Sequence, residues 1–309
     1  MNHETADLNG QKIAVLMGGP GSERLVSMAS GKGVLEALLS LGLNAYGVEV
    51  SGDEFALLEG TGLAFNVIHG TYGEDGGVQA ELERRGVRYT GEGVEESRIA
   101  IDKIRSKECF VRHGVPTPAF EVIRAGSRPS IEIPLVLKAP KEGSSVGIYI
   151  VREPSELEPA LEAVARYSDT ILVEEFVEGR ELTVGILGDE PLPVIEIRAR
   201  TDFYNFENKY PFLNPKAAGA DHLCPAPLEV EVEKVVRDTA LRAHRALGLR
   251  VYSRVDLLLK EDGSVYVLEV NTIPGMTPSS LLPEAAGAVG ISYAQLCRTV
   301  IELSLSRKS

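Results

Sequence analysis

The sequence contains no tryptophan and only three cysteines, Cys109, Cys224 and Cys297, among its 309 residues. These cysteines lack the paired spacing of a zinc site or a disulfide framework, so we treat them as structural and expect a reducing compartment. There is no block of lysine and arginine, and the net charge is -13. Because a nucleic-acid groove needs a basic surface to neutralise phosphates, we expect no nucleic-acid partner.

Long hydrophobic runs are also missing. No apolar stretch reaches the ~20 residues that span a membrane, and residues 1–11 lack the basic-then-apolar pattern of a signal peptide. We therefore expect a cytoplasmic protein with no membrane partner. Hydrophobic residues still make up 44% of the chain. A chain of this length and composition can form one large domain, or two to three ordinary ones, with real cores.

The N-terminal third alternates apolar strands with a helical pattern. Strands are predicted at residues 13–17, 46–50 and 65–68, and a helical pattern runs through Leu41. The first strand leads into a glycine-rich loop before Glu23, and the third ends at His69 in another. Open α/β sheets bind ligands at such strand ends. We predict a Rossmann-like α/β domain over residues 1–95.

The pattern changes beyond this domain. Short strands are predicted at 135–138 and 170–173, and helices at 97–113, at 229–247 and from 294 onward. We interpret residues 96–181 as a smaller nucleotide lobe of α+β character. Residues 182–309 are predicted to form a C-terminal lobe that carries the metal and substrate site.

One hairpin of the C-terminal lobe places two acidic residues together. If residues 262–263 form a two-residue type I′ turn, Asp256 lies opposite Glu269, and Arg254 lies opposite Asn271. Facing carboxylates repel each other unless a cation lies between them. The two carboxylates and the Asn271 amide are oxygen ligands that suit Mg²⁺, which also binds nucleotide phosphates. This pattern indicates nucleotide chemistry.

The other face of this hairpin is predicted to be core. It consists of Val255, Leu257 and Leu259 against Tyr266, Leu268 and Val270. For any single acidic pair, a solvated strand face in a register shifted by one residue is the better interpretation. Three oxygen ligands beside an arginine favour the metal site instead.

Neither common nucleotide signature is present. The chain has no G-x-x-x-x-G-K-[ST], and Arg24 takes the last glycine position of G-x-G-x-x-G, which argues against a dehydrogenase. Instead, Lys138 ends a buried strand, and residues 142–147 supply small residues whose backbone N–H groups can approach phosphate oxygens. By itself, this loop could equally be a flexible hairpin turn.

Several motifs occur in an informative order. They are Gly18-Gly19, Glu23-Arg24, Val26-Ser27, His69-Gly70, Gly73-Glu74-Asp75-Gly76, Asp102-Lys103, Arg105-Ser106-Lys107, Lys138, Glu142 to Gly147, Asn208-Lys209-Tyr210, Cys224-Pro225-Ala226, Arg254, Asp256, Glu269-Val270-Asn271-Thr272 and Pro274-Gly275-Met276-Thr277. Together they resemble the D-alanine:D-alanine ligases of the ATP-grasp superfamily over nearly the whole chain. The resemblance implies an ATP-grasp fold behind the Rossmann-like domain. It also implies that a D-alanyl phosphate forms from ATP and is captured by the amine of a second D-alanine.

The resemblance implies roles for individual residues. The implied catalytic residues are Glu23, Ser144, Tyr210, Arg254 and Gly275, and the implied substrate contacts are His69, Lys209, Ser280 and Leu281. The implied ATP contacts are Lys103, Lys138, Glu142, Ser145, Glu174, Glu175, Phe176, Val177 and Glu181. The implied metal ligands are Asp256, Glu269 and Asn271, holding two Mg²⁺ ions, with Mn²⁺ as the alternative. In this scheme Arg254 and the Gly275 N–H face the oxyanion of the tetrahedral intermediate.

Other interpretations stay open for single residues. Glu23 could simply favour a helix dipole, Tyr210 could be a packing residue, and His69 could be structural. The resemblance implies that Glu23 binds the ammonium of the first D-alanine. It also implies that Ser144 and Tyr210 form hydrogen bonds with Glu23 that close a lid over the site. Residues 211–220 are longer and more apolar than such a lid normally is.

The resemblance also bears on the substrate and on alternatives. Lys209-Tyr210 is similar to the dipeptide-forming members, so D-alanine is the expected acceptor. The alternatives are a related ADP-forming ligase, including a D-alanine:D-lactate ligase, and an ATP-binding regulatory protein without activity. Retention of Arg254 and both acidic metal ligands argues against the inactive protein. A homodimer is expected from the family.

Overall fold

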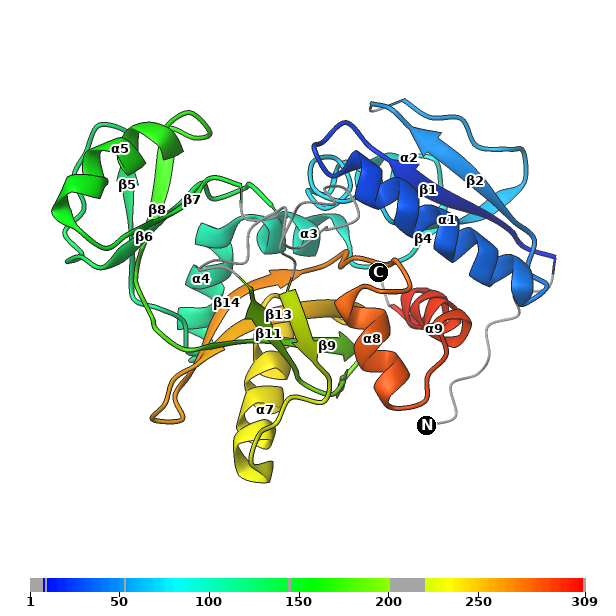
Figure 1. Ribbon diagram of the computed structural model, residues 1–309. Helices are drawn as coiled ribbons and strands as arrows, with labels where there is room; N and C mark the ends of the chain where they lie inside the picture. The colour runs from blue at the N-terminus through cyan, green and yellow to red at the C-terminus, as the bar shows by residue number, and fades with distance from the viewer. Residues whose placement is uncertain (1–7, 9, 53, 144–145, 201–219, 308–309) are drawn as a thin grey trace.

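A computed structural model describes residues 8, 10–52, 54–143, 146–200 and 220–307. Three sheets make three neighbouring parts of the molecule (Figure 1). One sheet is parallel and two are antiparallel, which confirms the predicted α/β class with α+β character in the nucleotide lobe. We name them the N-terminal, central and C-terminal sheets. The predicted domain boundaries at residues 95 and 181 remain predictions.

The N-terminal sheet is fully parallel, with strand order β2-β1-β3-β4. Its strands are β1 (Lys12–Gly18), β2 (Ala45–Val50), β3 (Thr61–Asn66) and β4 (Arg88–Tyr89). Alternate residues of β1 point to two cores: Ile13 and Val15 pack with helix α1 (Arg24–Ser40), and Ala14 and Leu16 pack with the α2 helix. Helix α2 spans Gly77–Arg84. The third strand was predicted too late, since β3 ends at Asn66.

The central sheet is antiparallel, with order β5-β8-β6-β7. Its strands are β5 (Phe120–Arg124), β6 (Leu135–Lys138), β7 (Ile148–Val151) and β8 (Thr170–Glu175). Helix α5 (Pro154–Val164) covers it and completes a separate small core. Figure 1 shows this part, in green, apart from the other two. It joins the rest of the molecule through the chain before β5 and the chain after β8.

The C-terminal sheet has the order β12-β11-β9-β13-β14, with β10 paired to β9. Its strands are β9 (Arg180–Leu187), β10 (Glu190–Pro191), β11 (Ile195–Ala199), β12 (Ala220–Leu223), β13 (Tyr252–Leu259) and β14 (Val265–Asn271). Helix α7 (Val230–Ala246) buries one face of this sheet. Two further helices follow, α8 (Leu281–Ala288) and α9 (Tyr293–Ser306).

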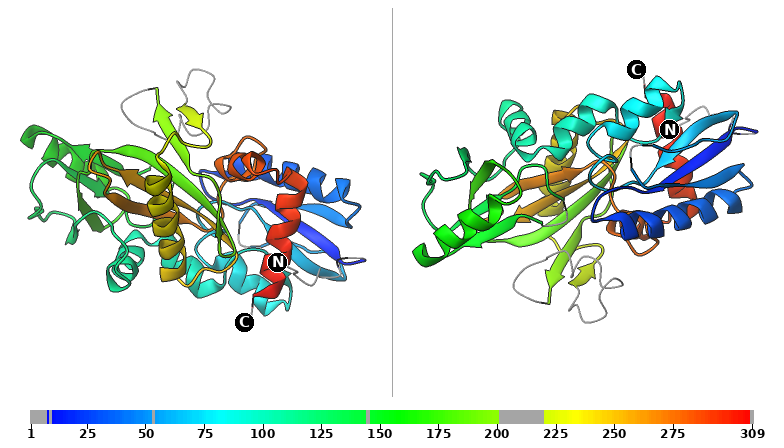
Figure 2. Two further views of the ribbon diagram at one scale, coloured as in Figure 1. Left: turned by 90° about the horizontal axis from the view of Figure 1, so that it is seen from below. Right: turned by 90° about the horizontal axis from the view of Figure 1, so that it is seen from above.

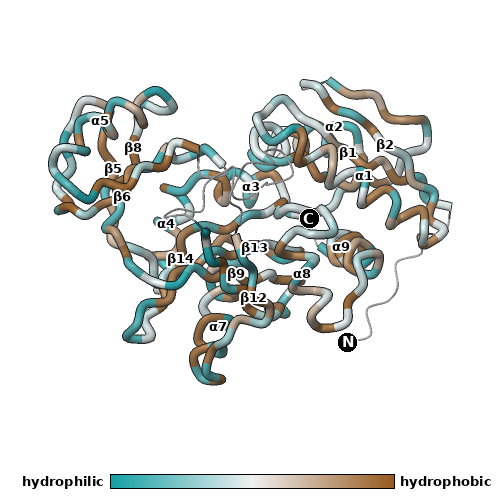
Figure 3. The backbone as a smooth tube through the Cα atoms, in the orientation of Figure 1, coloured by the Kyte–Doolittle hydropathy of each residue, from teal (hydrophilic) through white to brown (hydrophobic). Residues whose placement is uncertain are grey.

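Helix α9 packs against the first strand and helix of the N-terminal part of the molecule. It packs against α1, and its buried residues share a core with β1 and β3. Figure 2 shows α9, in red, across the blue N-terminal strands and helix in both views. Hydrophobic residues concentrate along the strands, whereas edge turns such as the tip between β13 and β14 are hydrophilic (Figure 3).

The single helix predicted at residues 97–113 is wrong. The chain forms α3 (Val94–Ile101) and α4 (Lys103–Arg112), which are separated by the extended residue Asp102. The Asp102 carboxylate accepts hydrogen bonds from the backbone N–H groups of Ile104 at 3.1 Å and Arg105 at 3.3 Å. An aspartate in this position satisfies N–H groups at the start of a helix. The cap therefore sets where α4 begins and places Lys103 in its first turn.

The β13–β14 hairpin has the predicted register at its open end only. Asp256 lies opposite Glu269, but Leu257 lies opposite Val267, so Leu268 is passed over in a bulge. The turn is also longer than predicted, because Lys260 pairs with Ser264 around residues 261–263. Gly263 has a φ of 84°, the left-handed conformation that glycine adopts in such three-residue turns. The two differences shift the register in opposite directions and cancel at Asp256.

The bulge also changes which residues form the core. Val265, Val267 and Val270 are buried, whereas Tyr266 and Leu268 are only half-buried. The prediction of Tyr266 and Leu268 as core residues is therefore wrong.

Candidate active site

The acidic pair predicted from the hairpin lies on the face of the C-terminal sheet opposite α7. Asp256 is 7% exposed and accepts a hydrogen bond from Thr183 Oγ1 at 2.7 Å and one from Asn271 Nδ2 at 3.2 Å. The Arg254 guanidinium donates two hydrogen bonds, of 2.9 and 2.8 Å, to the same carboxylate. Such a paired arginine contact fixes both partners in geometry as well as charge. Asp256 is thus held in one orientation, and Arg254 lies beside the proposed metal ligands.

The donor set fits a hard cation. Asp256 and Glu269 are direct cross-strand neighbours, and Asn271 lies opposite Arg254. Within the described ranges, no group of three or more His, Cys, Asp or Glu side chains could hold a metal. Two carboxylates and an amide oxygen fit Mg²⁺, because this ion usually completes its shell with water and nucleotide phosphates. The metal assignment remains a proposal.

Lys103 joins the acidic pair to the small-residue loop of the central sheet. Its Nζ lies 3.3 Å from Glu269 Oε2 and donates a hydrogen bond of 2.7 Å to the backbone carbonyl of Glu142. The side chain is nearly buried, and the Asp102 cap holds its helix. The ammonium therefore stands between a proposed metal ligand and the proposed phosphate loop.

Lys138 belongs to a buried row of charges. Its Nζ lies 2.8 Å from one carboxylate oxygen of Glu174, and Lys107 Nζ lies 3.0 Å from the other. Burial raises the pKa of Glu174, but the charges of Lys138 and Lys107 outweigh burial and hold that pKa below its ordinary value. Glu174 is therefore a carboxylate, and its side chain faces the predicted phosphate clamp. Glu174 and Lys138 were assigned separately to adenine and phosphate, yet they form one unit.

The rest of the predicted adenine segment crosses from the central to the C-terminal sheet. Glu175 accepts a hydrogen bond from the Ala119 backbone at 3.0 Å, which ties β8 to the chain before β5. Phe176 and Val177 are half-buried in the connection to β9. Glu181 lies two residues before Thr183 on β9, on the strand face that also carries Asp256.

His69 and Glu74 form a buried pair after β3. His69 Nδ1 lies 2.9 Å from the Ile273 carbonyl and 3.7 Å from Glu74 Oε1. Burial lowers the pKa of His69, but its interaction with Glu74 and the charge of Glu23 together outweigh burial, so that pKa is raised. Burial is the main reason why the pKa of Glu74 is also raised. This pair can hold a proton near the proposed substrate site.

Glu23 lies where two glycine loops converge. A Cβ atom on Gly70 would lie 2.8 Å from Glu23 Oε2, and one on Gly143 would lie 3.1 Å away. The carboxylate thus lies beside both the loop after β3 and the loop after β6. Since β1 and β3 are neighbours in the sheet, Glu23 and His69 also meet at the strand ends where open α/β sheets bind ligands. This position fits a contact to a substrate ammonium.

The loop after β14 closes the site from the C-terminal side. Ser280 precedes the first residue of α8, Leu281, and its hydroxyl accepts a hydrogen bond from the Thr277 backbone at 3.1 Å. A Cβ atom on Gly275 would lie 2.9 Å from Ser280 Oγ, so only glycine fits without a shift. Backbone N–H groups at a helix start attract carboxylates. Ser280 and Leu281 are therefore well placed for a substrate carboxylate.

Four predicted site residues lie outside the described ranges: Ser144, Ser145, Lys209 and Tyr210. The predicted lid also falls there, except for Ala220 at the start of β12. Their roles remain predictions.

Four residues near the site were given no role from the sequence: Ser30, Glu74, Lys107 and Thr183. Ser30 Oγ lies 3.2 Å from His69 Nε2 and accepts a hydrogen bond from the Met276 backbone at 3.3 Å. Glu74 could have been identified from the sequence, because it is an acidic residue within a glycine-rich loop. Thr183 meets Asp256 only through the β9–β13 pairing, which no local pattern indicates.

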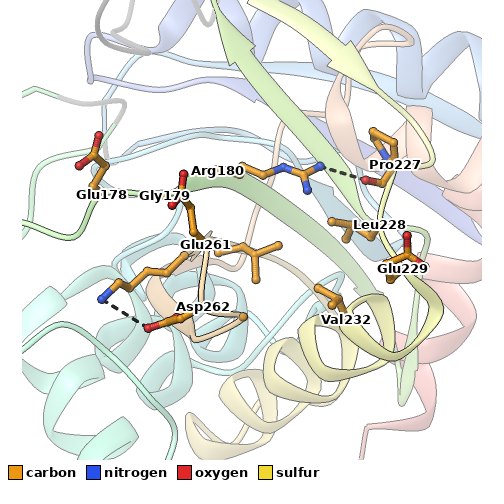
Figure 4. Close-up of a pocket in the computed structure, with 12 residues that line it drawn as sticks. Glu178, Gly179, Arg180, Pro227, Leu228, Glu229, Val232, Glu261 and Asp262 are labelled. Carbon is orange, nitrogen blue, oxygen red and sulfur yellow. Dashed lines mark hydrogen bonds and ion pairs between the residues drawn. The ribbon is translucent and has the colours of Figure 1, made fainter.

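A cavity of about 820 Å³ lies elsewhere, at the hairpin tip and the start of α7 (Figure 4). Leu259 and Val232 line it, and Leu259 packs in the core beneath α7. The cavity is therefore on the opposite face of the sheet from Asp256. Figure 4 shows Arg180 turned toward Pro227, and this arginine also pairs with Glu196 at 2.7 Å. The proposed metal and phosphate groups do not line this cavity.

None of the described helices is long and apolar enough to cross a membrane.

Comparisons of the sequence and of the structure with known proteins point to the same family. A family model described as the D-ala D-ala ligase C-terminus matches residues 111–302. The chain is 47% identical over 312 residues to a D-alanine–D-alanine ligase of Pelobacter propionicus, covering 98% of this chain and 99% of the relative.

Solved structures agree with the sequence relatives. The D-alanine–D-alanine ligase of Bacillus anthracis complexed with ATP has a TM-score of 0.82 at 32% identity, covering 96% of this chain and 97% of that one. The VanG D-Ala:D-Ser ligase of Enterococcus faecalis has a TM-score of 0.82 at 25% identity, covering 95% and 99%. These likenesses confirm the predicted ATP-grasp fold and the family resemblance.

Proposed function

This chain belongs to the D-alanine–D-alanine ligase family, and from that premise we propose that it joins two D-alanine molecules, using ATP, into D-alanyl-D-alanine. ADP and phosphate are released, and the dipeptide serves peptidoglycan precursor synthesis. The observation that carries the proposal is the position of Lys103. Its ammonium lies 3.3 Å from Glu269 and 2.7 Å from the Glu142 carbonyl, so one cation links the acidic pair to the glycine-rich loop.

The first step is phosphoryl transfer. A carboxylate oxygen of the first D-alanine forms a bond to the γ-phosphorus of ATP, and the bond from that phosphorus to the oxygen it shares with the β-phosphate breaks. Lys103 and Lys138 neutralise phosphate charge, and Glu23 holds the substrate ammonium. Mg²⁺, held by Asp256, Glu269 and Asn271, would supply further charge neutralisation when bound. Two ions are proposed, with Mn²⁺ as the alternative.

The second step forms the peptide bond. The amine of the second D-alanine attacks the acyl carbon, and the carbon–oxygen bond to phosphate then breaks. Arg254 and the Gly275 N–H donate to the oxyanion, a contribution of roughly 3 kcal/mol per donor in other enzymes. Ser280 and the Leu281 N–H hold the acceptor carboxylate. The amine must lose a proton before it attacks, and we propose that the buried pair of His69 and Glu74 influences where that proton goes.

The remaining assignments concern the nucleotide and the lid. We propose that Glu142 and Ser145 border the phosphates, that residues 174–177 meet adenine and that Glu181 accepts from the ribose hydroxyls. Ser144, Lys209 and Tyr210 are proposed to close the site over the acyl phosphate, which water would otherwise hydrolyse. We also propose a cytoplasmic homodimer, which light scattering of the purified protein would test.

The test is turnover of the purified protein with ATP, Mg²⁺ and D-alanine. We expect release of ADP and one dipeptide per ADP. D-lactate and D-serine, compared as acceptors across pH, separate the related ligases, because an amine must be deprotonated before attack whereas a hydroxyl titrates differently. ATP binding without turnover of any D-amino or hydroxy acid would favour an inactive regulatory protein and overturn the proposal.

A further inference from the structure

Lys107 is a fully buried lysine that the proposed mechanism leaves without a role. It lies on α4, and its side chain is 0% exposed. Its Nζ donates a hydrogen bond of 2.6 Å to Thr117 Oγ1 and lies 3.0 Å from Glu174 Oε1. The Phe120 ring closes the site, with its centroid 5.3 Å from the ammonium. No solvent reaches this charge, so its partners alone stabilise it.

The contacts of Lys107 lead to two different sheets. Thr117 connects Lys107 to β14, because its hydroxyl donates a hydrogen bond of 2.8 Å to the carbonyl of Val267. Val267 stands two residues before the proposed metal ligand Glu269. On the other side, Glu174 belongs to β8 of the central sheet and holds Lys138 at 2.8 Å. Lys107 therefore sits where the central sheet is tied to the strand that carries the metal ligands.

Stability alone gives no reason for this row of charges. Replacing a buried ion pair or triad by hydrophobic residues of similar volume is often neutral or stabilising, because removing charges from water is costly. What the row does supply is position. Each oxygen of the Glu174 carboxylate is engaged by a different ammonium, so its orientation is fixed, and Lys138 is fixed in turn.

We propose that Lys107 is a positioning residue of the nucleotide site, which orients Glu174 and, through it, Lys138, relative to the β14 strand. The inference rests on the proposed function of Lys138 as a phosphate contact. It predicts that Lys107 governs ATP binding without touching ATP. D-Alanine binding, which involves other loops, does not depend on it.

The charge of Lys107 adds a pH dependence. Burial and, to a smaller extent, the charge of Lys138 on β6 lower the pKa of Lys107 to about 8, against the opposing effect of Glu174 and Glu175 on β8. Above that pH the lysine loses its proton, and Glu174 loses one of its two cations. We expect ATP binding to weaken above about pH 8 for this reason, and a variant without the lysine to lack this component.

The experiment measures ATP affinity by titration calorimetry for the full chain, for Lys107→Met and for a matched control, Lys234→Met, on the exposed side of α7. Lys107→Met should bind ATP about tenfold more weakly, the usual effect of removing a group that orients a ligand contact. The control should bind like the unaltered protein. In turnover assays the KM for ATP should rise, and the KM for D-alanine should stay within about twofold.

Testing Lys107→Met in a protein that already carries Glu174→Gln distinguishes a positioning role from a general loss of structure. If Lys107 acts through Glu174, adding Lys107→Met to Glu174→Gln should change ATP affinity by less than about twofold. The comparison of Glu174→Gln with the double variant can also be made if Lys107→Met alone fails to fold, because Glu174→Gln removes the buried carboxylate that would have lost one of its two cations. An undiminished tenfold loss in the Glu174→Gln background, or equal ATP affinities of Lys107→Met and the unaltered protein, would overturn the inference. A protein that binds ATP but makes no dipeptide would defeat only the proposed function.

Discussion

Glu269 lies directly opposite Asp256 across strands β13 and β14, with Lys103 Nζ 3.3 Å from its Oε2 atom. Two carboxylates held as cross-strand neighbours repel each other, and here Arg254 and Lys103 each compensate one of them. A cation shared by both would strengthen this arrangement. The relationship makes Glu269 the most direct place to test the metal assignment.

Glu269→Gln should abolish ligase activity while the fold stays intact. The substitution keeps the size of the side chain but removes its charge, so we expect kcat to fall at least about 100-fold. ADP release measures the activity, and circular dichroism the fold. Glu261→Gln, at the exposed hairpin turn, is the control. Near-normal turnover of Glu269→Gln, or turnover unchanged by a chelator of divalent ions, would refute the metal site.

Gly275→Ala should impair catalysis through a steric effect. The added Cβ would lie 2.9 Å from Ser280 Oγ, so the loop or the serine must move. We expect kcat to fall roughly tenfold or more, because a donor and a substrate contact are displaced together. Steady-state kinetics with D-alanine measures this. Gly287→Ala, where the new Cβ meets nothing within 4 Å, should retain activity, and equal kinetics for the two variants would contradict the proposed role of Gly275.

Asp102→Ala should weaken both the fold and ATP use. Loss of the cap leaves two N–H groups of α4 without their acceptor, which costs about 1 kcal/mol of unfolding free energy. Because Lys103 is the first residue of this helix, the KM for ATP should also rise. Urea unfolding and kinetics measure the two effects. Asp238→Ala, at an exposed position of α7, should show neither effect. An unchanged KM for ATP in Asp102→Ala would show that the cap does not influence the ATP site.

The buried residue His244 should make the protein sensitive to acid. Its Nδ1 lies 2.8 Å from Ser253 Oγ, and burial lowers its pKa from 6.5 to about 4. Between these values the unfolded chain binds a proton that the folded chain does not, so stability falls as pH falls from about 6.5 to about 4. The loss is about 3 kcal/mol by linkage.

Urea unfolding across this pH range tests the prediction. His244→Gln should flatten the dependence, whatever its absolute stability. His113→Asn alters an exposed histidine and keeps His244, so it should keep the slope. An equally steep decline in His244→Gln would show that other groups cause it.

Local signals in the sequence predicted a large part of the molecule. Strand β6 lies at the predicted residues 135–138, and α7 and α9 differ from prediction by about one residue at the ends that were specified. The acidic pair was also found, although the turn and the bulge were both missed. The capping aspartate Asp102 was within reach of sequence reasoning, since aspartate before a helix is a known start signal.

The contacts that complete the site could not be predicted in the same way. Thr183 reaches Asp256 through a strand pairing between residues 73 positions apart in the chain. Lys107 and Glu174 come from a helix and a strand of different parts of the molecule, and neither periodicity nor spacing says that they meet. Distant pairings depend on how the three sheets pack, which is a property of the whole chain.

Helix α9 gives the molecule an order of assembly. The core of the N-terminal sheet includes residues of α9, which are made long after β1 and α1. During translation, β1 and α1 leave the ribosome early, with one of their apolar surfaces uncovered until residues 293–306 emerge. The substrate loops after β1 and β3 are anchored in that same sheet, so the surroundings of these loops are complete only once α9 has been made.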